Sequence, residues 1–379
     1  MTRTLVILSL CTLAGFADTP TTAQQPKQEL PLRVVSPEVH ADKKVTFRIN
    51  APKATEVTIR GDWMVGEEKL TKDENGVWSV TVGPLAPDFY SYAFTVDGVR
   101  TLDAANPTVK QGNNVYSIAN MFFLGGPEAD FQDNMLVPHG DVRKVWYQSG
   151  TLKEQRRMHV YTPPGYDADS DKYPVLYLLH GAGDDDSAWS TIGRAGFILD
   201  NLIAAKKAKP MIVVMPNGNL PWPGIGKVDP LLDRFTNDLL KDVVPHVEKQ
   251  FRVKTGAKDR ALAGVSMGGA QTMHVLATNP ERFGYVALWS TSMFGGDRDP
   301  AAFEQQYEAF LKNAEAVNKS VKLLEITVGE KDFILNASKA TSGVFKKYGV
   351  KHQLKLTGGS HTMINWRQYL NELAPKLFQ

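Results

Sequence analysis

The chain has almost no cysteine, no strong net charge and no long apolar run. Its 379 residues include one cysteine, Cys11, which excludes an intramolecular disulfide and a metal site built from several thiolates. The 43 Lys and Arg nearly balance the 41 Asp and Glu, and no dense basic run is present, so we expect no nucleic-acid partner. No apolar segment reaches the length of a membrane-spanning helix, so we expect no membrane association of the mature form.

The first residues have the pattern of a targeting segment. Arg3 gives a positive start, residues 5–16 are apolar, and small residues follow. This pattern predicts a secretory signal peptide over residues 1–23, which contains Cys11. A short membrane anchor is the alternative, but the apolar run is too short for it. We therefore expect a secreted or periplasmic protein that does not depend on disulfides.

The length favours two domains, because one core rarely supports a chain of 379 residues. Residues 34–123 alternate apolar and polar side chains in short runs separated by turn residues, among them the hairpin signal Asp97-Gly98. This predicts a small β-sandwich over residues 30–124. Residues 125–139 are expected to be a linker, with the Gly-Gly-Pro stretch at 125–127 as its hinge.

Beyond the linker the pattern changes to buried strands alternating with helices, which predicts an α/β domain over residues 140–379 with a mostly parallel sheet flanked by helices. The expected strands are 142–147, 157–161, 174–179, 211–215, 285–289, 323–328 and 352–356, and the expected helices are 198–205, 236–251 and 302–317.

A Gly-x-Ser-x-Gly motif at Gly264, Ser266 and Gly268 lies between a predicted strand and a predicted helix. A serine on such a sharp turn is exposed, and the flanking glycines leave room for an incoming carbonyl. The following helix directs its positive end at developing negative charge. Alone the motif is weak, because it would match by chance in roughly one chain of this size in eight.

A serine that performs acyl transfer needs a base and a carboxylate that orients the base. Asp332 and His361 each follow a predicted strand and complete the order serine, acid, histidine that is typical of α/β-hydrolases. We therefore predict a catalytic triad of Ser266, Asp332 and His361. Glu330 is the rival carboxylate and His352 the rival histidine.

The loop after the strand 174–179 reads His180-Gly-Ala-Gly. A backbone N–H of Ala182, with Gly181 as the alternative, is expected to form an oxyanion hole with that of Met267. We interpret His180 as a structural residue that hydrogen-bonds the loop. The three aspartates at 184–186 suggest either a cation site or, more simply, a solvated loop that leads into a helix cap. The predicted mechanism requires neither a metal nor an organic cofactor.

Three tryptophans are candidates for contact with substrate, namely Trp63, Trp78 and Trp222. Trp63 follows a Gly-Asp turn and is expected either to stack on a sugar or to fill the sandwich core, whereas Trp78 lies in an alternating strand and is expected in the core. Trp222 belongs to the Pro- and Gly-rich loop 217–229, which either shapes the acyl or sugar pocket or is a surface excursion.

These motifs resemble known families. The catalytic half is similar to carbohydrate esterase family 1, the feruloyl and acetylxylan esterases, and also resembles esterase D and the mycolyltransferases. The sandwich resembles immunoglobulin-like modules related to family-48 carbohydrate-binding modules. The matching segments are 47–52, 61–63, 76–78 and 90–98 in the sandwich, and 173–181, Trp189, 214–218, Phe235, 238–240, Pro245, 264–269, Pro280, Phe283, 358–361 and 366–367 in the catalytic half.

The resemblance implies a secreted serine esterase that removes feruloyl or acetyl esters from plant cell-wall xylan, with a polysaccharide or oligosaccharide ester as its partner. Gly181 and Trp189, in the matching segments, are further candidates for substrate binding. Thr362 departs from a frequent His-Asp pair and alters the expected pocket wall. The alternatives are a siderophore esterase, a sugar acyltransferase and an inert carbohydrate-binding protein. A siderophore esterase would favour a cationic pocket, and no Arg/Lys cluster lies near the motif segments.

Overall fold

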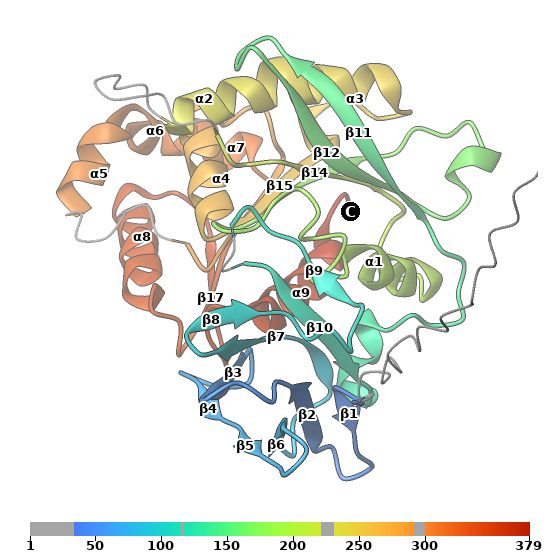
Figure 1. Cartoon of the computed structure of the whole chain (residues 1–379). Helices are drawn as coiled ribbons and strands as arrows, with labels where there is room; N and C mark the ends of the chain where they lie inside the picture. Colours follow the sequence, from blue (N-terminus) through green and yellow to red (C-terminus); the bar gives the residue numbers. More distant parts are fainter. Residues whose placement is uncertain (1–33, 115–116, 221–230, 292–299) are drawn as a thin grey trace, which may run out of the picture. The chain divides into compact units, whose positions relative to one another are not determined.

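The computed structural model describes residues 34–379 except 115–116, 221–230 and 292–299 (Figure 1). The predicted signal peptide and Trp222 lie outside the described residues. Within the described part of the chain, the helices are too short or too polar for any of them to cross a bilayer.

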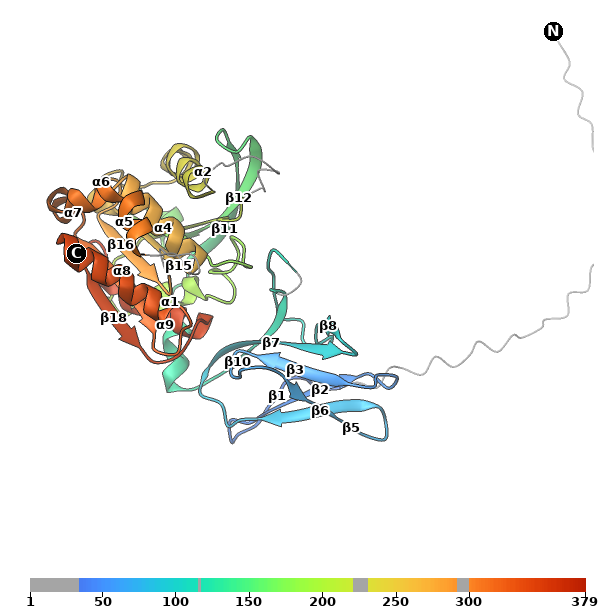
Figure 2. The same ribbon diagram turned by 90° about the vertical axis from the view of Figure 1, so that its left-hand side faces the viewer.

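The N-terminal part is a β-sandwich of antiparallel sheets, as predicted (Figure 2). One sheet has the strand order β1–β2–β6–β5, and the other has the order β4–β3–β7–β10–β9 with β8 paired to β7. The strands are β1 (Glu38–Val39), β2 (Val45–Asn50), β3 (Val57–Gly61), β4 (Glu68–Lys69), β5 (Thr71–Lys72), β6 (Val77–Val82), β7 (Asp88–Val96), β8 (Val99–Thr101), β9 (Val109–Lys110) and β10 (Ala119–Leu124).

Alternation along the strands produces the sandwich core. Tyr90, Tyr92 and Phe94 of β7 point into a buried cluster that also holds Trp78, whose indole N–H donates to the Ala51 carbonyl at 3.0 Å. The prediction that Trp78 fills the core is confirmed. The hairpin signal is confirmed too, because Asp97 (φ 46°) and Gly98 (φ 81°) join β7 to β8 with positive φ at both turn positions.

The C-terminal part is an α/β domain with a central sheet in the order β11–β12–β14–β13–β15–β16–β17–β18. Strands β13 to β18 run parallel to one another, and the β11–β12 hairpin is antiparallel at the edge. The strands are β11 (Asp141–Ser149), β12 (Glu154–Thr162), β13 (Val175–Leu179), β14 (Ile212–Pro216), β15 (Arg260–Val265), β16 (Tyr285–Trp289), β17 (Leu323–Gly329) and β18 (Gln353–Thr357). The helices are α1 (Ala195–Ala204), α2 (Leu231–Asp238), α3 (Val244–Gln250), α4 (Met267–Thr278), α5 (Pro300–Gln306), α6 (Glu308–Lys312), α7 (Ala314–Ser320), α8 (Leu335–Tyr348) and α9 (Met363–Leu373). Single 3₁₀ turns occur at Tyr166–Ala168, Ala257–Asp259 and Ala374–Lys376.

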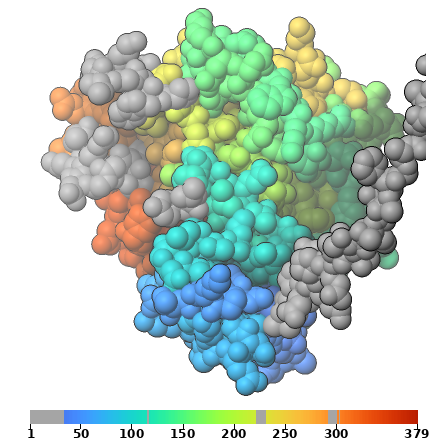
Figure 3. Space-filling model, in the orientation of Figure 1, coloured from blue at the N-terminus to red at the C-terminus, as the bar shows by residue number. Residues whose placement is uncertain are grey.

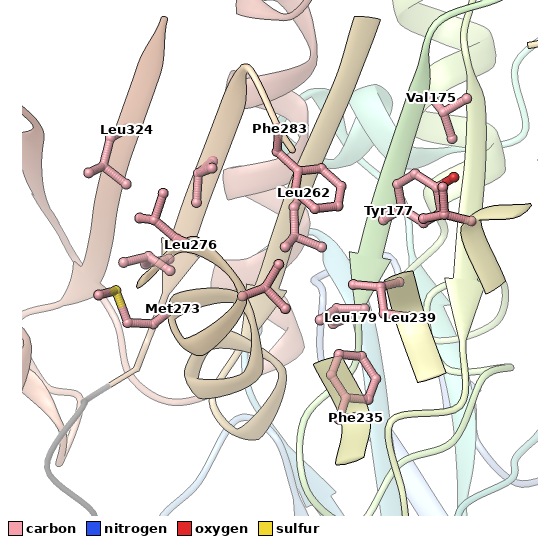
Figure 4. Packing of buried hydrophobic residues seen from close by; sticks show 14 of the residues in the cluster. Val175, Tyr177, Leu179, Phe235, Leu239, Leu262, Met273, Leu276, Phe283 and Leu324 are labelled. Carbon is pink, nitrogen blue, oxygen red and sulfur yellow. The ribbon is translucent and has the colours of Figure 1, made fainter. Parts of the chain in front are cut away.

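Helices cover both faces of this sheet, so its central strands β13 to β16 are buried on both sides. In β13, Val175, Tyr177 and Leu179 pack into the cluster formed with α2, α3, α4 and α8 (Figure 4). Their neighbours Leu176 and Leu178 pack into the opposite cluster with α1 and α9. This explains why the strands read as continuous apolar runs.

Two predicted helices are interrupted in the structure. The range 236–251 contains the end of α2, a π-helical turn over Leu239–Val243, and α3. The interruption lies beside Pro245, which has no N–H to continue the helical hydrogen bonds. The range 302–317 is divided among α5, α6 and α7. One break lies at Asn313, a residue type that favours helix ends over helix interiors.

The expected linker is packed against the α/β domain. Residues Pro127–Gln132 form a 3₁₀ helix, and the Gln132 carbonyl accepts a hydrogen bond from the Arg194 Nε at 2.6 Å. The Gln132 side-chain amide donates to Asp88 of β7 at 2.8 Å. Residues 34–379 form one compact unit, and the role of the Gly-Gly-Pro stretch as a hinge stays a prediction.

A buried ion pair fixes the sandwich to the α/β domain. The Arg367 side chain on α9 is 0% exposed and lies 2.7 Å from the Asp88 carboxylate. Its guanidinium also donates to the carbonyls of Phe89 and Ile192 at 2.7 and 2.8 Å. Because Phe89 belongs to the buried cluster around α1 and α9, the two parts share a core as well as an ion pair.

Candidate active site

Ser266 occupies the turn between β15 and α4 in a strained conformation, with φ 51° and ψ −114°. Its N–H donates to the Trp289 carbonyl at 3.0 Å. A Cβ at Gly264 would lie 2.3 Å from the Gly268 carbonyl oxygen, and one at Gly268 would lie 2.5 Å from that of His180. The glycines of the motif are therefore required by close backbone approach, which is the geometry expected of a nucleophile elbow.

His361 and Asp332 form a hydrogen-bonded pair. The His361 Nδ1 lies 3.0 and 3.1 Å from the two Asp332 carboxylate oxygens, and the carboxylate side chain is 0% exposed. Burial opposes ionisation, but the hydrogen bonds from His361 and from the Ile334 amide lower the pKa of Asp332. An ionised Asp332 holds the His361 Nδ1 as a donor and leaves the Nε2 free to accept a proton.

The rival residues are placed elsewhere. Glu330 is exposed. His352 has both ring nitrogens engaged, Nε2 with the Ser342 hydroxyl at 2.7 Å and Nδ1 with the Val350 carbonyl at 2.8 Å.

Ser266 and His361 line the same cavity, whose volume is about 500 Å³. Gly181, Ala182 and Trp366 line it as well, so the structure brings the expected oxyanion loop beside the serine. The exposed ring of Phe333 lies 4.5 Å from the His361 ring. Sequence analysis did not single out Phe333, although it directly follows the predicted acid.

The candidate oxyanion donors come from two backbone segments. Met267 is the first residue of α4, where N–H groups have no acceptor within the helix. Ala182 belongs to the loop after β13, which His180 holds in place: its Nδ1 contacts the Gly181 carbonyl at 2.8 Å and its Nε2 accepts the Gly218 N–H at 2.8 Å. With both nitrogens used, His180 has the structural role that the sequence suggested.

A second cavity, of about 680 Å³, lies beside Met267. Leu220, Leu231 and Leu232 give it an apolar lining, and His274 lies in its wall. The His274 ring bonds the Asp233 carboxylate and the Tyr307 hydroxyl, each at 2.7 Å. The loop expected to shape a pocket contributes Leu220, whereas Trp222 in that loop lies outside the described residues.

Two tryptophans proposed for substrate binding contact the cores of the two parts. Trp189 is 1% exposed, and its indole N–H donates to the Leu179 carbonyl at 3.1 Å, so the prediction that it contacts substrate is wrong. Trp63 is half-buried and stacks on Phe47 with ring centroids 5.2 Å apart. Trp63 thus packs against the sandwich core, and its contact with a sugar stays a prediction.

The sandwich supplies part of the cavity wall next to Ser266, through Arg60, Asp62, Ser91 and Lys110. The Lys110 ammonium lies 2.6 Å from the Asp184 carboxylate, with side chains 15% and 7% exposed. Sequence analysis missed these residues because no local pattern connects them with the motifs of the catalytic half.

The three aspartates at 184–186 form ion pairs. Besides Asp184 with Lys110, Asp186 pairs with Arg157 at 2.8 Å and with His159 at 2.7 Å. The expectation of a solvated loop is wrong, because Asp184 and Asp186 are buried. In the described ranges, no group of three or more His, Cys, Asp and Glu side chains is arranged to hold a metal ion.

Comparison with known proteins agrees with this geometry. Residues 149–377 match the family model described as "Putative esterase", and residues 35–109 match carbohydrate-binding module 48, the isoamylase N-terminal domain. The chain is 31% identical over 379 residues to an endo-1,4-beta-xylanase/feruloyl esterase of Xylanibacter ruminicola, covering 95% of this chain and 47% of that protein. The chain thus spans about half the length of this curated relative.

Solved structures show the same fold. A ferulic acid esterase superposes with a TM-score of 0.56 at 25% identity, over 64% of this chain and 99% of that one. The enterobactin esterase of Shigella flexneri superposes with a TM-score of 0.64 at 18% identity, over 89% of this chain and 93% of that one. The model of the "Putative esterase" family covers more than half of the residues of the chain, and the chain therefore belongs to this esterase family.

Proposed function

We propose that the protein is a serine esterase that removes feruloyl groups from plant cell-wall xylan. The observation that carries the proposal is the Asp332–His361 hydrogen bond beside a cavity that Ser266 also lines. The 31% identity to a xylanase/feruloyl esterase supports the choice of substrate. We further propose that residues 1–23 direct export and are then removed, which the N-terminal sequence of the secreted protein would test.

In the proposed reaction, the Ser266 Oγ attacks the ester carbonyl while the His361 Nε2 takes the hydroxyl proton. The N–H groups of Ala182 and Met267 stabilise the oxyanion. As the carbonyl re-forms, the bond to the sugar oxygen breaks, and His361 gives its proton to that oxygen. Water then attacks the acyl-enzyme with His361 again as base, which releases the acid and restores Ser266.

This chemistry assigns a side of the site to each half of the substrate. His361 must protonate the leaving oxygen, so the cavity that His361 lines is proposed to hold the sugar. The cavity beside Met267 then holds the acyl group. Its volume of about 680 Å³ and its leucine lining suit an aromatic ring better than an acetyl group. The polar side chains in its wall, Asp233, Gln271 and Gln306, offer partners for a phenolic hydroxyl.

The experiment is hydrolysis of methyl ferulate and of acetylated xylan, side by side. The variants are Ser266→Ala and, as a matched control, Ser170→Ala at an exposed serine outside the cavity. Ferulate release that vanishes in Ser266→Ala and persists in Ser170→Ala supports a feruloyl esterase. Acetate release alone would mean an acetylxylan esterase. Unchanged activity of Ser266→Ala would overturn the mechanism.

A second candidate is hydrolysis of a siderophore ester, and one observation favours it. No cationic cluster was expected near the motif segments, but the sandwich brings Arg60, Arg100 and Lys110 to a cavity that His361 lines, and a siderophore chelate is anionic. The likeness to the enterobactin esterase is a likeness of fold. Hydrolysis of a 2,3-dihydroxybenzoyl-serine ester, with methyl ferulate left intact, would favour this candidate.

A further inference from the structure

The strand register places three cationic residues on one face of a sandwich sheet. Across β3, β7 and β8, Arg60 pairs with Ala93 and Arg100 pairs with Thr95. Positions 93 and 95 of β7 share a face because side chains alternate along a strand. Lys110 of β9 reaches the same face through the pairing of β9 with β10 and of β10 with β7. This face is opposite to the one that carries the sandwich core.

Within the described part of the chain, Arg60 and Arg100 have no carboxylate partner. Among the residues that the structure describes, no Asp or Glu lies within 4.0 Å, the ion-pair distance, of either guanidinium, whereas Lys110 is paired with Asp184 at 2.6 Å. Arg100 donates one hydrogen bond, to the Ile118 carbonyl at 3.1 Å, and its buried Nε has no partner. Burial and the Arg60 charge both lower the pKa of Arg100, and the Glu67 charge acts against this.

The one carboxylate on this wall, within the described part, is hydrogen-bonded to Ser91 and forms no ion pair with the arginines. Asp62 accepts hydrogen bonds from the Ser91 N–H at 2.7 Å and hydroxyl at 2.8 Å, and burial raises its pKa, which favours its neutral form. Like-charged groups that lack a counter-charge are destabilising, so Arg60 and Arg100 together form a site that an anion would stabilise.

This site is continuous with the catalytic centre. Arg60, Arg100 and Lys110 line a cavity of about 480 Å³ together with Ser360, His361 and Thr362. The region from β8 to β10, teal in the space-filling view, lies at the surface of the face shown (Figure 3). Because the arginines and His361 line one cavity, a ligand bound at the arginines can extend to His361.

We propose that Arg60 and Arg100 form an anion subsite for a carboxylate on the alcohol side of the ester. This rests on the proposed function, in which the alcohol side is a xylan chain, and it identifies the substrate as an acidic xylan that carries a uronic acid near the feruloylated sugar. A guanidinium binds a carboxylate through two parallel N–H donors, which fixes its orientation. The sandwich thereby selects substrates by charge.

The test compares matched substrates. Feruloylated xylan oligosaccharides that carry glucuronic acid are compared with the same oligosaccharides after reduction of the carboxyl to a neutral alcohol. The measured quantity is the ratio of kcat/KM for the acidic over the neutral substrate. We expect a ratio of about 10 or more for the wild type, the effect of one hydrogen-bonded charge pair. The ratio should fall toward 1 in Arg60→Gln and in Arg100→Gln.

The control variant is Lys53→Gln, which removes one positive charge from an exposed position of the sandwich outside the cavity. It should keep the wild-type ratio. Thermal unfolding of each variant checks that it folds. Binding of both oligosaccharides to Ser266→Ala gives a second readout that does not depend on turnover, and the acidic form should bind more tightly.

A wild-type ratio near 1, or an equal ratio in Arg60→Gln and Lys53→Gln, would overturn the proposal. Loss of hydrolysis of an anionic catecholate ester in the arginine variants, with no change for the uronate substrate, would overturn the uronate assignment. Failure of the wild type to hydrolyse methyl ferulate would instead contradict the proposed function, so the two failures are distinguishable.

Discussion

Replacing Arg367 by methionine tests whether the sandwich and the α/β domain are held together by their buried ion pair. The Arg367 side chain is 0% exposed, and its partner Asp88 is 8% exposed. The variant keeps most of the side-chain volume but removes the charge and all three hydrogen bonds of the guanidinium. Asp88 keeps the Gln132 amide at 2.8 Å and the Phe89 N–H at 2.7 Å as donors.

Removal of one partner of a buried pair typically costs about 3–5 kcal/mol, because the remaining charge is left without compensation. We expect Arg367→Met to lower the free energy of unfolding by about this amount. Asp88→Asn combined with Arg367→Met should restore part of the loss, since neither charge then remains. A matched control is Arg48→Met, which removes a partly exposed arginine that pairs with Glu38 at 2.7 Å. It should cost no more than about 1 kcal/mol.

The assay is urea unfolding, followed by tryptophan fluorescence and by esterase activity. Both signals should be lost at a lower urea concentration in Arg367→Met, and together, because the ion pair joins the two parts. If Arg367→Met cost no more than Arg48→Met, the buried pair would not hold the parts together and the reasoning would be refuted.

Four further predictions concern the site and its support. Asp332→Asn should lower kcat by about 10³–10⁴-fold, since the amide stabilises the wrong His361 tautomer; steady-state kinetics measure this, and a loss below tenfold would contradict the role. Folding lowers the pKa of Asp332, so the stability that the ionised carboxylate contributes is present above its unfolded pKa of 3.8 and is lost as pH falls through its pKa in the folded state. The urea midpoints of the wild type and of Asp332→Asn should therefore converge below about pH 3.8. A difference between the midpoints that stays constant with pH would argue against this. Gly264→Ala should destabilise the fold by about 1–3 kcal/mol or more, because its Cβ would lie 2.3 Å from the Gly268 oxygen; an unchanged urea midpoint would show that the turn can relax. Trp189→Phe should cost about 1–3 kcal/mol by leaving the Leu179 carbonyl unpaired, with KM unchanged; a raised KM with normal stability would return Trp189 to the substrate site.

Features that depend on local pattern were predictable from the sequence. The elbow at Ser266 was predicted because glycines, a preceding strand and a following helix adjoin it in the chain. Asp332 and His361 were predicted to join it because parallel strands end at the same edge of a sheet. The alternation in β7 predicted the sandwich core in the same way.

Features that depend on tertiary packing were not predictable. Trp189 was proposed as a binding residue, but the sequence does not show whether a tryptophan side chain faces a cavity or a core. The helix expected over 302–317 breaks where Asn313 interrupts an otherwise good periodicity. The positions of Arg60 and Arg100 near His361 depend on strand pairing and on docking of the sandwich, and neither leaves a local signal.

The alternation in the sandwich strands has a consequence for divergence among related enzymes. In β3, Ile59 belongs to the folding core while its neighbour Arg60 faces the cleft. If the wall binds substrate as proposed, folding and recognition use different residues of the same strand. Substitutions at the outward positions would then change which substrate is recognised while the inward positions keep the sandwich folded. Such a wall can acquire a new specificity through a few point mutations, without insertion of a loop or rearrangement of the triad.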